Sequence, residues 1–184
     1  MLQKKCAFQK IFIFFMILVF TIAIVIAFAN NSKYEPIILD NSSFLLPKRI
    51  TEGMKRSDGE GYVFFQSDDY QVLGVESECH TIDDTILDSI NISNEDLNKI
   101  KSINSEYELM EFVDDTSGTL VDSGRTDKPS FDNYFIRYRG DDFERVVLAY
   151  KEGDKTLLEI IDTPLDDLSE KEIIKMLGNM GFRN

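Results

Sequence analysis

Residues 11–29 form an uncharged apolar run in which Thr21 is the one polar side chain. As an α-helix, this run would be roughly 28 Å long at about 1.5 Å per residue, close to the ~30 Å hydrocarbon thickness of a bilayer. A core helix of a soluble protein carries polar residues along one face, whereas this run is apolar on every face. The sequence therefore predicts a transmembrane helix at residues 11–29.

The distribution of charge gives this segment a direction. Lys4, Lys5 and Lys10 precede it without an acidic residue, and all 33 Asp and Glu residues follow it. Because positive charge is retained in the cytoplasm, we expect a single-pass protein of the cell membrane with its N-terminus inside. The predicted parts are a cytoplasmic basic tail (residues 1–10), a transmembrane anchor (11–29), a polar spacer (30–36) and an extracytoplasmic domain (37–184).

A cleaved signal peptide is the open alternative to a retained anchor. Ala27-Phe28-Ala29 fits the small-x-small pattern of a signal peptidase site. The apolar run, however, is longer than the ~7–15 residues usual for a cleaved signal, which favours an uncleaved anchor. Cleavage near Ala29 would instead release a secreted domain.

The chain beyond the anchor is strongly acidic. Without the three leader lysines it has 17 basic residues against 33 acidic ones, a net charge of −16. Such a charge repels nucleic acid and anionic lipid headgroups, so we expect no nucleic-acid partner. It suits a basic protein or peptide, or a divalent cation, although an acidic surface also serves solubility alone. The length fits one domain with a real core.

Alternation and capping patterns predict an α+β fold. Strand-like runs occupy residues 62–66 and 70–75, and an antiparallel β-meander follows at 134–139, 144–150 and 156–162. Helices are expected near 82–90, after Ser93 and after Ser169, where capping-box residues stand. Residues 107–113 are predicted as a strand and 48–61 as an exposed loop with a helical turn. We expect the helices to pack on one face of an antiparallel sheet.

Cys79 is the one cysteine after the anchor, so no disulfide can form within the outer domain. His80 follows it directly, and neighbours on a strand point to opposite faces, which argues against a catalytic Cys–His pair. Cys79 is therefore interpreted as a buried thiol, or alternatively as a reactive or intermolecular one. One Cys and one His are too few for zinc, and the acidic loops lack the calcium-loop pattern. No cofactor or metal site is predicted.

Arg137, Arg139 and Arg145 lie on the predicted meander, where the sign of the charge locally reverses. They are a candidate interaction patch on a face that alternation predicts to meet solvent. The alternative is cross-strand pairing of these arginines with Glu144 or Glu159.

The chain has no Gly-x-Ser-x-Gly, phosphate-binding loop or dinucleotide-binding motif. We therefore expect a non-enzymatic protein- or peptide-binding module at the cell surface. A hydrolase that uses acidic residues is one alternative. A pilin-like or secretion-machine subunit is another, although Asn30, Asn31 and Pro36 would interrupt the long helix of a pilin.

Overall fold

The computed structural model describes Met16, Val19 and residues 33–102, 105–114, 118–126 and 132–183. Residues Pro36–Asn184 form one compact unit. Within the described parts of the chain, no helix is long and apolar enough to cross a membrane. The predicted tail, the predicted anchor apart from Met16 and Val19, and residues 30–32 of the predicted spacer lie outside the described residues. The end of that spacer belongs to strand β1 (Tyr34–Ile38).

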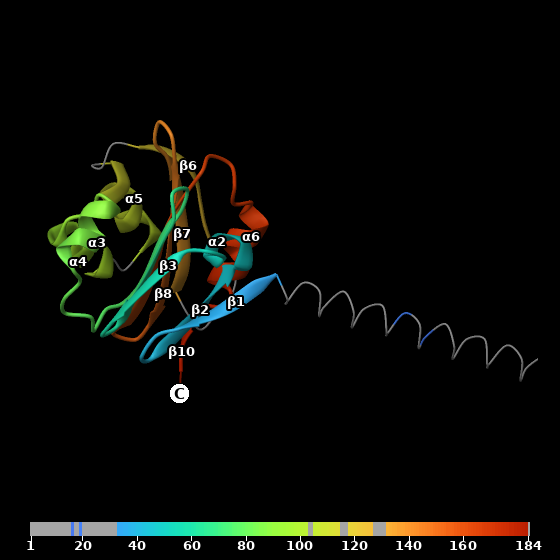
Figure 1. Cartoon of the computed structure of the whole chain (residues 1–184), viewed down its shortest axis with the longest axis horizontal. Coiled ribbons are helices and arrows are strands. Elements are labelled where there is room, and N and C mark those ends of the chain that lie inside the picture. The colour runs from blue at the N-terminus through green and yellow to red at the C-terminus, as the bar shows by residue number, and fades with distance from the viewer. Residues whose placement is uncertain are drawn as a thin grey trace, which may run out of the picture. The chain divides into compact units, whose positions relative to one another are not determined.

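A seven-stranded antiparallel sheet forms the centre of the domain (Figure 1). Its spatial order is β3-β4-β5-β9-β8-β7-β6, so the β7–β8–β9 meander is extended on one side by the β3–β4–β5 meander. The predicted α+β class with an antiparallel meander is confirmed. The strands are β3 (Lys55–Gly59), β4 (Tyr62–Gln66), β5 (Gln71–Glu76), β6 (Thr119–Arg125), β7 (Asp132–Arg139), β8 (Glu144–Glu152) and β9 (Lys155–Thr163).

Helices cover both faces of this sheet (Figure 1). On one face lie α3 (Asp84–Ser89), α4 (Asn94–Ser102) and α5 (Glu106–Asp114). On the other lie α2 (Lys48–Thr51), α6 (Glu170–Leu177) and a small sheet of β1 (Tyr34–Ile38), β2 (Ser42–Pro47) and β10 (Gly181–Phe182). The expectation that all helices share one face is therefore wrong. Helix α3 follows strand β5 and helix α6 follows strand β9. Because the two helices leave the sheet from different strands, each can pack on a different face.

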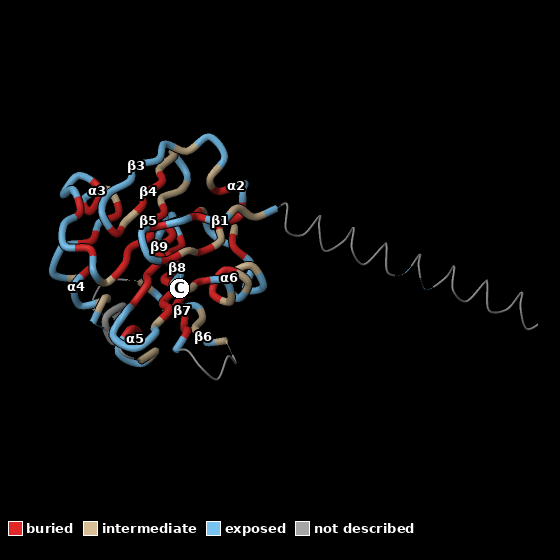
Figure 2. The backbone as a smooth tube through the Cα atoms, turned by 90° about the horizontal axis from the view of Figure 1, so that it is seen from below, coloured by how far each residue is buried: buried red, intermediate tan, exposed pale blue. Residues whose placement is uncertain are grey.

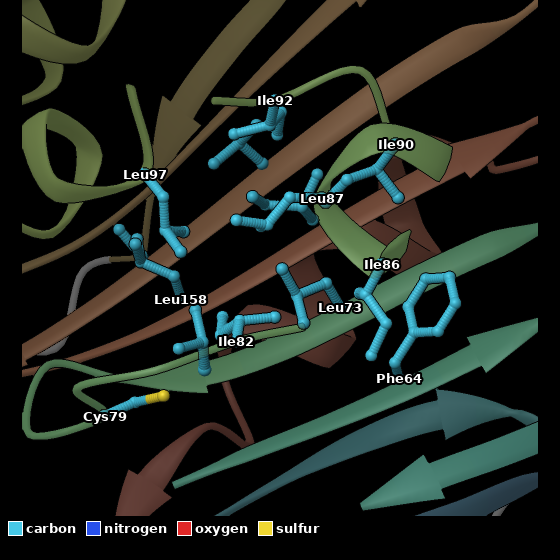
Figure 3. Packing of buried hydrophobic residues seen from close by; sticks show 14 of the residues in the cluster. Phe64, Leu73, Cys79, Ile82, Ile86, Leu87, Ile90, Ile92, Leu97 and Leu158 are labelled. Carbon is cyan, nitrogen blue, oxygen red and sulfur yellow. The ribbon is translucent and has the colours of Figure 1, made fainter. Parts of the chain in front are cut away.

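Apolar side chains of α3 pack directly on the central strands (Figure 3). Ile86, Leu87 and Ile90 meet Phe64 and Leu73 in one buried cluster. The central strands β4, β5, β9, β8 and β7 are largely red in Figure 2, whereas the edge strand β3 and much of α4 are exposed. Burial of this kind contributes about 25 cal/mol per Å² of apolar surface. The packing of the helices on the sheet therefore stabilises the domain.

The α6 face of the sheet is also buried, although one of its strands is partly polar there. Phe135 is 1% exposed and shares this face with Arg137. The predicted solvent exposure of the polar side of residues 134–139 is wrong for most of its length, because α6 packs on this side of β7.

Two predictions of secondary structure are also wrong. Residues 107–113 belong to helix α5, in which Tyr107 is 68% exposed and Leu109 is fully buried. A strand would place these two side chains on the same face. The predicted loop at 48–61 contains helix α2 and the edge strand β3, whose five residues are all exposed. Few apolar side chains are present there to mark a strand in the sequence.

Gly74 allows the ring of Phe44 to lie against β5. A Cβ atom at this position would be 2.5 Å from Phe44 Cε1, and Phe44 is buried and unable to move away. We expect Gly74→Ala to lower the free energy of unfolding by about 1–3 kcal/mol. The matched control is Gly181→Ala, because no atom lies within 4 Å of the added methyl group. Equal losses in urea unfolding of the two variants would contradict this account of the packing.

Candidate functional site

A groove of about 1280 Å³ opens at one end of the large sheet, where the α3–α4 connection approaches the β7–β8 turn. We call it the hairpin groove. Its walls come from three parts of the chain: the end of α3 and the start of α4 (Asp88, residues 91–93, Asp96), the start of β6 (Gly118, Thr119, Val121), and the β7–β8 turn with its flanks (residues 138–143, Arg145).

A second hollow of about 430 Å³ adjoins the groove. The two share Asn91, Asp142, Phe143 and Arg145 as common lining residues. On its far side the second hollow is lined by the β4–β5 turn, which contributes Asp68 and Asp69. The β7–β8 turn therefore forms a ridge between two acidic hollows.

The ring of Phe143 lies on this ridge, folded against Gly140 of the β7–β8 turn. The amide of Gly140 donates a hydrogen bond to the Phe143 carbonyl at 2.9 Å. A Cβ atom on Gly140 would lie 2.7 Å from the Phe143 ring, so glycine permits the ring to fold back over the turn. Phe143 is 41% exposed, and the Arg145 guanidinium carbon lies 5.7 Å from the ring centroid, a cation–π distance.

Arg145 ties helix α3 to the sheet. Its Nε and one Nη donate to the Asp162 carboxylate at 2.5 and 2.7 Å, and the same Nη donates to the Ile90 carbonyl. Burial of the guanidinium lowers its pKa, but the hydrogen bonds and charge of Asp162 outweigh burial and raise the pKa above the usual value. Arg145 is therefore a positively charged side chain held in an ion pair with Asp162.

Arg137 and Arg139 lie on the opposite face of the sheet from Arg145. The fully buried carboxylate of Glu144 contacts Arg137 Nε at 2.8 Å and Arg139 Nη2 at 3.5 Å, and Asp166 binds Arg139 from the neighbouring loop. The structure thus divides the predicted three-arginine patch between two faces. Of the two predicted alternative partners, Glu144 pairs with these arginines, whereas no ion pair with Glu159 occurs among the described residues.

The α3–α4 connection has a defined shape. Asn91 adopts a left-handed conformation (φ 50°) directly after α3, a position that asparagine tolerates better than most residues. The Ser93 hydroxyl then accepts a hydrogen bond from the Asp96 amide at 3.0 Å and donates one to the Asp96 carboxylate at 2.6 Å. This cap was predicted from the sequence, and it fixes one wall of the hairpin groove.

The groove is negative because most of its carboxylates are uncompensated. Asp88, Asp141 and Asp142 are exposed, and none has an ion pair within the described part of the chain. The two arginines of the groove are already paired with carboxylates elsewhere. These aspartates were not predicted as site residues. The aromatic residue Phe143, which follows Asp142 directly in the sequence, was the feature that could have indicated a binding site here.

Cys79 is 3% exposed and lies in the apolar cluster near Ile82 (Figure 3). Its Sγ is 3.6 Å from the Thr81 carbonyl, and burial raises the pKa of the thiol. His80 is exposed. A buried, protonated thiol is a poor nucleophile, so these positions fit the buried-thiol interpretation. Among the described residues, no group of three or more His, Cys, Asp or Glu is placed to hold a metal.

Glu159 is the most unusual ionisable residue of the core. It is fully buried on β9, and neither carboxylate oxygen has a hydrogen-bond partner in the described structure. Burial raises the pKa of this carboxyl well above its ordinary value. Its cross-strand neighbours are Gly74 and Leu148, and it lines neither hollow.

No protein-family model matches this chain, and no curated protein matches it. Among solved structures, it is similar to the solution structure of cyanobacterial PsbP (CyanoP) from Synechocystis sp. PCC 6803. The TM-score is 0.50 at 16% sequence identity, over 82% of this chain and 93% of that one. At this identity the likeness concerns the fold.

Proposed function

We propose that this chain is a membrane-anchored extracytoplasmic domain that binds a protein or peptide partner at the cell surface without catalysing a reaction. The hairpin groove is the observation that carries the proposal. Small-molecule sites usually occupy ~300–1,000 Å³, and the groove, at about 1280 Å³, exceeds that range and opens beside an edge strand. Such dimensions suit a segment of a polymer.

The walls of the groove are supported by contacts beneath them. Arg145 joins α3 to the sheet through Ile90 and Asp162. Glu144 and Asp166 hold Arg139 at the foot of the β7–β8 turn. A preformed surface loses less conformational entropy on binding than a mobile one, which favours recognition.

The anchored, outward-facing location rests on the apolar run at 11–29 and on the basic residues before it. The PsbP-like fold is compatible with an extracytoplasmic or membrane-associated domain. A hydrolase would call for carboxyl groups of raised pKa inside a hollow. The carboxyl group of Glu159 has a raised pKa, but it lies in the core, which favours binding over hydrolysis.

Labelling of an introduced cysteine tests location and binding together. We expect Asp141→Cys to react with a membrane-impermeant maleimide in intact cells, and to react faster once the protein is purified in detergent, because the partner no longer covers the groove. Asp154→Cys, on the exposed β8–β9 turn, should react equally fast in both states. Cys79 is buried and contributes little background, and Cys6, the other cysteine of the chain, is replaced by serine in both variants.

Two results would contradict the proposal. If neither cysteine reacts before the cells are opened, the domain does not face outward. If Asp141→Cys reacts at the same rate in cells and in detergent, nothing occupies the groove.

A further inference from the structure

We infer that the hairpin groove takes an extended segment of a partner protein that is rich in lysine or arginine. This inference rests on the binding function proposed above and specifies the chemistry of the partner. It follows from the charges on the groove walls, from the exposed ring of Phe143 and from the edge strand β6.

The negative charges of the groove come from both of its sides. Asp88 stands on α3, and Asp141 and Asp142 stand on the β7–β8 turn. A chain lying between these walls would place cationic side chains next to each of them. An acidic or phosphorylated segment would instead be repelled, because like charges brought together across an interface cost several kcal/mol.

No cation of the groove itself satisfies these carboxylates. Arg145 is bound to Asp162, and Arg139 is bound to Glu144 and Asp166. Among the described residues, no cation neutralises these three aspartates, so their charge is available to a partner. A single metal ion is a poor match, since no three carboxylates of the described residues converge on one point.

Phe143 provides a surface for the aliphatic stems and cationic heads of lysine or arginine. One guanidinium, that of Arg145, already lies at a cation–π distance from this ring. The ring remains 41% exposed, so it has further surface for a second cation.

The edge strand β6 favours an extended partner. It is the last strand of the sheet, and among the described strands it pairs with β7 alone. Thr119 and Val121 of this strand line the groove. A peptide in extended conformation can therefore hydrogen bond to the free edge while its side chains reach the aspartates.

Binding of a defined peptide to the full chain in lipid nanodiscs tests the inference. The probe is a fluorescein-labelled peptide of alternating lysine and valine, and the control probe replaces lysine with glutamate. We expect the lysine peptide to bind, the glutamate peptide not to bind, and the affinity to fall with salt. The groove variant Asp88→Asn/Asp141→Asn/Asp142→Asn should lose about tenfold in affinity.

The matched control changes the net charge equally at exposed sites outside both hollows: Glu52→Gln/Glu60→Gln/Asp154→Asn. It should retain nearly all of the wild-type affinity. Equal losses in the two triple variants would show general charge attraction and overturn the inference. Failure of the lysine peptide to bind would also overturn it. If Asp141→Cys is nonetheless protected in cells, the binding function stands and only the basic partner is wrong.

Discussion

Glu144→Gln is expected to lower the free energy of unfolding by about 3–5 kcal/mol, because it removes the charge of the nearest carboxylate partner of a nearly buried arginine. Glu144 is 0% exposed, and Arg137, at 2.8 Å, has a side chain that is only 12% exposed. Glutamine preserves the size of the side chain, so the loss reports charge rather than a cavity. Urea unfolding followed by circular dichroism measures it.

Asp166→Asn is the matched control for this prediction. Asp166 also contacts Arg139, but its side chain is 72% exposed, and exposed ion pairs contribute about 0–1 kcal/mol. Asn also tolerates the left-handed backbone at this position (φ 59°). If Asp166→Asn proved as damaging as Glu144→Gln, the buried carboxylate would not be the centre of this cluster.

Glu159→Leu is expected to stabilise the domain by about 1–3 kcal/mol at pH 7, because the wild-type carboxyl is buried without a hydrogen-bond partner. Its pKa is raised in the folded state, so the folded protein holds a proton that the unfolded chain releases near pH 4.5. The contribution of this group is therefore fully present below pH 4.5. It declines as the pH rises toward the folded pKa, by up to about 1.4 kcal/mol per pH unit.

Glu159→Gln separates the effect of the proton from the effect of burial. Glutamine stays neutral, so the stability of this variant relative to wild type should increase between pH 5 and pH 8. The control is Glu76→Gln at a second buried carboxyl, which accepts hydrogen bonds from the Asn41 amide and the Ser42 hydroxyl. That change should be destabilising, since it disrupts contacts that Glu159 lacks. A constant difference between wild type and Glu159→Gln across this pH range would contradict a protonated Glu159.

Features that depend on local sequence were predictable. The Ser169–Glu172 capping box and the Ser93–Asp96 cap both occur at the starts of helices. The three strands of the C-terminal meander begin and end close to their predicted limits, because their alternation and turn residues lie within the segments themselves.

Features that depend on distant contacts were not predictable. The residues of helix α5 were predicted as a strand. The burial of Leu109 and the exposure of Tyr107 depend on packing against distant parts of the chain, which the local pattern does not contain. The faces that α3 and α6 cover depend on the pairing of β9 with β5, whose paired residues are all more than 80 positions apart in the sequence. The hairpin groove likewise joins Asp88 with Asp141, and no local pattern relates these two aspartates.

The arginines illustrate the same limit. Cross-strand pairing with Glu144 was one of two predicted alternatives to an interaction patch, because these residues stand opposite each other in a meander. The partner of Arg145, by contrast, includes the carbonyl of Ile90 on a helix 55 residues away. Of the three arginines, Arg137 and Arg145 are largely buried in ion pairs, whereas Arg139 is 37% exposed.

Photocrosslinking in living cells tests the central claim, that a partner occupies the hairpin groove, most directly. A photoreactive phenylalanine analogue is placed either at Val121, in the groove, or at Ile174 on α6; these wild-type residues are 45% and 37% exposed. We expect a covalent adduct from Val121 to a basic segment of another protein, identified by mass spectrometry, and none of the same mass from Ile174. The absence of a protein adduct from Val121, or the same adduct from both positions, would contradict the account.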